Sequence, residues 1–110
     1  EPASLAAAAS RLLDRVEIVL ISRGAKGGLL MTKQGVWQAR CAGRGRVVST
    51  VGCGDYLLAG FLKSLSENCN PAAALKIAIE VATAKAWGRT EDNKGVSRTL
   101  REIQVAVKRI

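Results

Sequence analysis

The chain has 110 residues, of which 48% are hydrophobic and 24% are charged, and its formal net charge is +8. This composition suits one domain with a buried core and argues against intrinsic disorder. No apolar stretch approaches the roughly 20 residues of a membrane span, and none forms the core of a signal peptide. The positive charge suits nucleic acid or a phosphorylated small molecule, but aromatic residues are only 4%, which disfavours stacking with single-stranded nucleic acid.

The first elements are a helix and a strand. An amphipathic helix is predicted over residues 3–15 by apolar side chains at helical spacing: Leu5, Ala9, Leu12, Leu13 and Val16. Residues 17–22 then form an almost continuous β-branched apolar run. Such a run is typical of a strand that is buried on both faces of a parallel sheet.

Two further strands are predicted after a glycine-containing break at residues 23–27. Residues 28–32 and 36–39 have strand composition, and the short segment 33–35 between them has the composition of a turn. Beyond these strands, we expect a loop over residues 41–46. A short strand is expected at Val47 and Val48.

Helices dominate the remainder of the pattern. A helix is predicted after Asp55, with an apolar face of Leu57, Leu58, Phe61, Leu62 and Leu65. A second helix is predicted to run to about Trp87, because Asn70 is a favourable N-cap and Pro71 suits the first helical position. A polar segment covers residues 88–95.

A final helix is predicted near the carboxyl end. Thr99 and Glu102 have the spacing of a capping box, and Leu100, Ile103 and Val107 would form the inner face of the helix.

The order of the predicted elements indicates the fold class. Strands interrupted by glycine turns and followed by helices predict a single α/β domain over residues 1–110. Domains of this class bind ligands at the carboxyl ends of their strands.

The segment 49–55, Ser-Thr-Val-Gly-Cys-Gly-Asp, carries the chemistry. Gly52, Cys53 and Gly54 lead into a helix, so backbone N–H groups and the helix dipole would create an anion hole there. Asp55 in the first turn could act as the base that deprotonates an attacking hydroxyl while the hole holds a phosphoryl group. An aspartate in a first helical turn is also ordinary dipole complementarity, and this spacing alone does not decide between the two.

Two other phosphate-binding motifs fit poorly. A dinucleotide fingerprint would require a third glycine at the position of Leu57. The segment 24–28 lacks the Gly-Lys-Ser/Thr sequence of a Walker A loop.

The cysteines do not indicate a metal site. Cys41, Cys53 and Cys69 lack zinc-site spacing and the chain has no histidine, so we expect no metal site formed by side chains. We expect the three cysteines to be reduced thiols in a cytoplasmic protein.

The segment 50–55, followed by Ala-Gly-Phe at residues 59–61, resembles the C-terminal signature of the PfkB carbohydrate kinase family. Residues 19–30 are similar to the strand–turn–strand that borders the nucleotide in that family. The segment 70–87 is similar to the helix that walls the adenine. The resemblance implies the C-terminal portion of a ribokinase-like three-layer α/β/α fold, with the phosphofructokinase and tagatose-phosphate branch as the nearest match.

The resemblance also assigns roles to residues. It implies that Asp55 is the catalytic base and lies beside the anion hole described above. It also implies that ATP with Mg²⁺ donates a phosphate to a sugar or sugar-phosphate hydroxyl. Nucleotide-binding roles are implied for Ser22, Gly24 and Gly27 in the turn and for Ala82 and Ala86 on the helix. Simple helix packing explains the two alanines equally well.

Several features depart from the family pattern. Ser49 stands where the family has Asp or Asn, which argues against a monovalent-cation site, and Tyr56 replaces a small residue beside the base. The family's sugar-binding and lid segments do not occur in the 110 residues, which begin with Glu1 rather than methionine. We therefore expect a segment of a longer kinase that binds nucleotide without turnover when isolated.

Two rival functions stay open. The chain could be a non-catalytic nucleotide-binding module derived from a truncated kinase. It could instead be a basic nucleic-acid-binding domain built on the loop at 43–46, which is the less favoured of the two. A half-domain with an uncovered sheet edge could also form a homodimer.

Overall fold

The computed structural model describes residues 1–42, 45–88 and 103–110, and all structural statements concern these residues. Their elements in chain order are α1 (Pro2–Ala9), the 3₁₀ segment η1 (Ser10–Asp14), β1 (Val19–Ser22), the 3₁₀ turn η2 (Gly24–Lys26), β2 (Gly28–Thr32), β3 (Gly35–Cys41), α2 (Cys53–Ser66), α3 (Pro71–Ala86) and β4 (Val105–Arg109). No helix in this part of the chain has the length and apolar character needed to cross a membrane.

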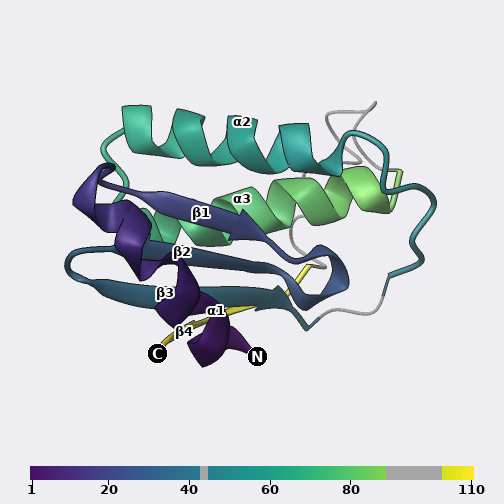
Figure 1. Cartoon of the computed structure of the whole chain (residues 1–110). Coiled ribbons are helices and arrows are strands. Elements are labelled where there is room, and N and C mark those ends of the chain that lie inside the picture. The colour runs from purple at the N-terminus through teal and green to yellow at the C-terminus, as the bar shows by residue number, and fades with distance from the viewer. Residues whose placement is uncertain (43–44, 89–102) are drawn as a thin grey trace.

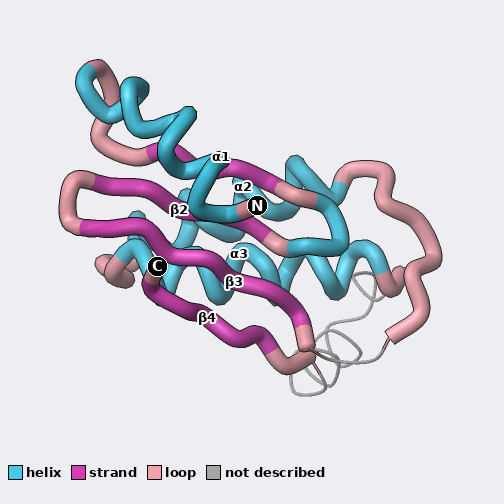
Figure 2. Tube along the Cα trace, turned by 60° about the horizontal axis from the view of Figure 1, so that its bottom comes forward, coloured by secondary structure: helices cyan, strands magenta, loops and turns pink. Residues whose placement is uncertain are grey.

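The four strands form one sheet in the order β1-β2-β3-β4, with every neighbouring pair antiparallel (Figure 2). The prediction of a parallel strand at residues 17–22 is therefore wrong. The five-residue connection 23–27 can join antiparallel strands, whereas a parallel pair needs a crossover of a dozen residues or more. The strand that is buried on both faces is β2, in which all five residues are buried.

The sheet separates two layers of helices (Figure 1). Because neighbouring residues of a strand point to opposite faces, Leu30 and Met31 belong to different cores. Leu30 packs with α2 and α3 in a core that includes Phe61, whereas Met31 packs with Ala6 and other residues near α1. The predicted three-layer α/β/α arrangement is confirmed.

Local sequence explains where the helices begin and end. The Asn70 Oδ1 atom accepts a hydrogen bond of 2.8 Å from the Ala73 N–H, and Pro71 occupies the first turn, as predicted. At the other end of the chain, α1 changes to a 3₁₀ helix after Ala9. Leu12, which the helical pattern placed on the inner face, is 53% exposed, because the change in helix type alters the face on which it lies.

Two predicted elements are wrong. Residues 105–109 form strand β4 instead of a final helix, since the half-buried Val105 and Val107 alternate with exposed residues and pair with β3. The predicted capping residues Thr99 and Glu102, together with Leu100, lie outside the described residues.

The short strand expected at residues 47–48 is also absent from the described structure, because this segment forms no ladder. Instead, the Val48 N–H donates a hydrogen bond of 2.7 Å to the Ala86 carbonyl. Cys41, which was expected in a loop, is the last residue of β3.

Glu80 on α3 provides a test of how this layer is packed. Burial raises the pKa of the Glu80 carboxyl above its ordinary value, although Lys76, 3.9 Å away, opposes the rise. The Glu80 carboxyl therefore keeps its proton to a higher pH in the folded state than in the unfolded state. The free energy of unfolding thus falls as the pH rises past the ordinary carboxyl range. Glu80→Gln should raise the Tm near neutral pH by up to about 4 °C. In thermal melts the gain should vanish near about pH 4, and a gain that is equal at both pH values would contradict this account.

Candidate active site

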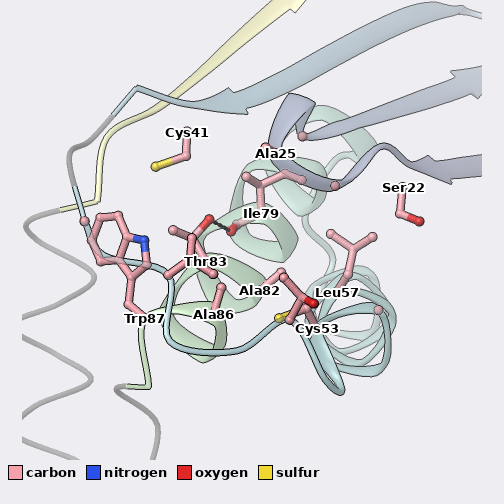
Figure 3. A pocket seen from close by; sticks show the side chains of 16 residues that line it. Ser22, Ala25, Cys41, Cys53, Leu57, Ile79, Ala82, Thr83, Ala86 and Trp87 are labelled. Atoms are coloured by element: carbon pink, nitrogen blue, oxygen red, sulfur yellow. Dashed lines mark hydrogen bonds between the residues drawn. The ribbon is translucent and has the colours of Figure 1, made fainter.

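A pocket of ≈ 440 Å³ lies where the turn after β1 approaches the start of α2 and the second half of α3 (Figure 3). We call it the α2/α3 pocket. Its volume lies within the range of small-molecule sites. The structure brings together here most of the residues that the sequence singled out: Ser22, Gly24, Gly27, Cys53, Gly54, Ala82 and Ala86. Gly52 and Asp55 do not line it.

The turn that forms one wall depends on glycine. Gly27 has a φ of 87°, and a Cβ atom at this position would lie 1.9 Å from the Ala39 carbonyl oxygen of β3. The turn is closed by a hydrogen bond of 2.8 Å from the Arg23 N–H to the Gly27 carbonyl. Absence of a side chain at Gly27 therefore lets the turn lie directly against β3, and this position brings Ser22 and Gly24 to the pocket.

At the start of α2, the described structure leaves backbone donors without an acceptor. Gly52 is the N-cap residue with a φ of 80°, a left-handed conformation that favours glycine. The Cys53 N–H donates to the Thr50 carbonyl at 3.2 Å, so this member of the predicted anion hole is already bonded within the chain. The N–H groups of Gly54 and Asp55 have no acceptor within the described part of the chain. An anion at this helix end could therefore accept hydrogen bonds from Gly54, a predicted member of the hole, and from the next residue, Asp55.

Asp55 lies in the first turn of α2, and its side chain is exposed. It follows Gly54, which lines the pocket and has no atom within 4 Å of the position that a Cβ would occupy. Gly54 thus borders open space, and the exposed Asp55 is the next residue along the helix. A hydroxyl that approached an anion held at this helix end would meet the carboxylate as a proton acceptor.

The other wall is the inner face of α3. Ala82 and Ala86 lie with Ile79 and Thr83 along this face, and Trp87 closes one end of the pocket (Figure 3). The Thr83 hydroxyl donates to the Ile79 carbonyl at 2.7 Å, so its hydrogen is used within the helix and the wall stays mainly apolar. This wall suits a flat apolar or aromatic group.

Sequence reasoning singled out neither Thr83 nor Trp87 as a pocket residue. The spacing of Ile79, Thr83 and Ala86 places them on one helical face, a signal that was available in the sequence. The place of Trp87 depends on a contact between distant segments, because a Cβ at Gly45 would lie 1.9 Å from its indole ring. Among the residues that the structure describes, no cluster of His, Cys, Asp or Glu could hold a metal ion.

Comparison with known proteins gives consistent matches. The family model described as pfkB family carbohydrate kinase matches residues 1–88. The chain is 37% identical over 93 residues to the 1-phosphofructokinase of Haemophilus influenzae, covering 84% of this chain and 29% of that protein. It is 35% identical over 96 residues to the D-tagatose-1-phosphate kinase of Bacillus licheniformis, covering 86% and 31%. The chain thus spans about a third of the length of these relatives.

Solved structures support the same fold. A putative phosphofructokinase from Staphylococcus aureus matches 99% of this chain and 36% of its own length, with a TM-score of 0.80 and 24% identity. Phosphofructokinase-2 from Escherichia coli matches 92% of this chain and 34% of its own length, with a TM-score of 0.78 and 19% identity. A nucleoside kinase of Methanocaldococcus jannaschii, described as a member of the ribokinase family, matches with a TM-score of 0.70. The ribokinase-like fold is therefore confirmed.

Proposed function

The chain belongs to the pfkB family of carbohydrate kinases, and we propose that it forms the nucleotide-binding and phosphoryl-transfer part of an ATP-dependent sugar or sugar-phosphate kinase. One observation carries the proposal: the N–H groups of Gly54 and Asp55 have no acceptor in the described part of the chain, Gly54 lines the α2/α3 pocket, and the exposed Asp55 is the next residue in the first turn of α2. An adenine-sized pocket, a phosphate-binding helix end and an adjacent base are the parts that phosphoryl transfer from ATP requires.

Each part has a defined task in this mechanism. The apolar wall that contains Ala82 and Ala86 holds the base of the nucleotide, and the turn at Ser22 and Gly24 borders its ribose and phosphates. The start of α2 stabilises negative charge on the transferring phosphoryl group through fixed N–H donors and the helix dipole. Asp55 accepts the proton of the attacking hydroxyl.

Mg²⁺ accompanies ATP in this proposal and neutralises charge on its phosphates. The described residues offer no carboxylate cluster for a metal. Magnesium commonly takes most of its ligands from water and nucleotide phosphates, so such a site is compatible with this chain.

The acceptor class follows from the relatives and from charge. Two of the matched relatives are named 1-phosphofructokinase and D-tagatose-1-phosphate kinase, and both names refer to phosphorylated sugars. A net charge of +8 favours a phosphorylated acceptor over a neutral one. We expect a cytoplasmic enzyme, since the three cysteines are free thiols. A homodimer is a further expectation, because β1 and β4 are the edge strands of the sheet formed by the described residues.

A second candidate is nucleotide binding without transfer by residues 1–110 on their own. The chain covers 29% of the Haemophilus influenzae relative, and transfer requires both substrates to be positioned away from water. ATP titration of the 110-residue protein combined with a sugar-phosphate kinase assay separates the two candidates. ATP binding without product supports the second, whereas product formation shows that the chain is sufficient for transfer.

A larger side chain in the pocket provides the most direct test of nucleotide binding. Ala86→Leu should weaken ATP binding by at least about tenfold, because the added atoms occupy the space proposed for the base. The matched control is Ala59→Leu, at an exposed position of α2 outside the pocket, which should leave the Kd unchanged. Isothermal titration calorimetry measures both. Equal ATP affinity in the two variants would contradict the assignment of this pocket to the nucleotide.

A further inference from the structure

Lys85 lies in the last turn of α3, and its side chain extends to the start of α2. Its Cε atom is 3.6 Å from the position that a Cβ on Gly52 would occupy. Its Nζ atom lies 5.6 Å from the centroid of the Tyr56 ring, within the range of a cation–π contact. The contact with Tyr56 therefore holds the ammonium group, and the Lys85 side chain passes near the glycine that caps α2.

This position is electrostatically unusual for a cation. The amino end of a helix carries a partial positive charge, so a lysine beside it is repelled unless an anion is present. The carbonyl end of α3 explains why a lysine is tolerated at position 85, and the Tyr56 ring attracts its ammonium group toward the start of α2 in spite of the helix dipole. In the described part of the chain, the recorded ion pair is Lys76 with Glu80, and Lys85 has no carboxylate within ion-pair distance.

The same helix end has unpaired N–H groups at Gly54 and Asp55 within the described chain. Backbone donors and a lysine ammonium at the same helix end are the usual elements of a phosphate site. A bound phosphate would satisfy the donors and remove the repulsion between Lys85 and the helix dipole. One ligand thus accounts for both features.

We propose that Lys85 binds the terminal phosphates of the nucleotide, together with the N–H groups of Gly54 and Asp55, and that the Tyr56 ring positions its ammonium group. This inference rests on the proposed function, because it names the cation that neutralises phosphate charge in the same site. Lys85 was not among the site residues that the sequence indicated.

The test compares ATP with adenosine, which carries no phosphate, in calorimetric titrations of the 110-residue protein. Lys85→Gln should weaken ATP binding by about tenfold or more, the effect of losing one charge-assisted contact, and should leave adenosine binding unchanged. Lys85→Arg should retain most of the ATP affinity. Lys76→Gln removes the same charge from an exposed position on the same helix and should bind ATP like the unsubstituted protein.

The outcomes separate this inference from the proposed function. Unchanged ATP affinity in Lys85→Gln, or an equal loss for ATP and adenosine, would overturn the role of Lys85 and leave the nucleotide pocket in place. If the unsubstituted protein binds neither ligand, the proposed function fails and the inference with it. Should Lys85→Gln not fold, acetylation of Lys85 in the unsubstituted protein gives the answer by mass spectrometry. ATP should protect Lys85 and adenosine should not, and lack of protection by ATP overturns the proposal.

Discussion

Gly27→Ala is expected to destabilise the protein by more than about 3 kcal/mol, a large fraction of the stability of a domain of this size. The new Cβ atom would lie 1.9 Å from the Ala39 carbonyl oxygen and 2.9 Å from the Arg40 Cα atom. Both contacts are with backbone in the interior of β3, so no side-chain rotation relieves them. The turn would have to separate from the sheet, and the left-handed φ of 87° adds further strain.

The neighbouring glycine supplies a matched control for this substitution. Gly24 also has a positive φ, of 57°, but a Cβ at this position meets no atom within 4 Å. Gly24→Ala should therefore cost only the left-handed conformation, about 1 kcal/mol. Urea denaturation followed by circular dichroism compares the two variants with the unsubstituted protein. Similar losses in both variants would mean that contact with β3 does not hold the turn in place.

The helices after residue 52 could be predicted because their signals are local. Asn70 and Pro71 define the start of α3 through contacts within four residues, and the glycines around Cys53 define the start of α2. The sheet topology could not be predicted in this way. An apolar run such as residues 19–22 contains no information about the direction of its neighbour, which was determined by the short connection that follows.

The error at the carboxyl end has a different physical cause. Ile103 and Val107 are four residues apart, a spacing that places both on one face of a helix and also on one face of a strand. The pattern is therefore ambiguous, and Val105 between them is the residue that favours the strand. Pairing with β3 then determines the outcome, and it depends on a partner strand that lies far earlier in the chain.

The same division applies to the candidate site. Glycine and aspartate at the start of α2 stood out because their chemistry and backbone freedom are readable from the sequence. Trp87 and Lys85 did not, because their positions depend on contacts with Gly45 and Gly52 on distant segments. The hydrogen bond that occupies the Cys53 N–H likewise appeared only in the structure.

Asp55→Asn is expected to lower phosphoryl transfer by about 10²–10⁴-fold, the usual contribution of a general base. Asparagine has nearly the same shape as aspartate but cannot accept the proton of the attacking hydroxyl. The loss should appear in kcat, whereas the Kd of ATP should stay within about twofold, because nucleotide binding depends on other groups. An intact anion site with a slow chemical step would identify Asp55 as the base.

The assay needs a sugar-binding part, since the chain spans about a third of its relatives. A chimera in which these 110 residues replace the matching segment of the Haemophilus influenzae 1-phosphofructokinase supplies one, and ATP consumption that depends on sugar phosphate measures transfer. Asp14→Asn, which removes an exposed carboxylate from η1, is the control and should retain full activity. If the chimera that carries Asp55→Asn keeps more than about a tenth of the activity, another group takes the proton, because the loss of a general base costs at least about 10²-fold. The free N–H groups of α2 would then serve phosphate binding alone.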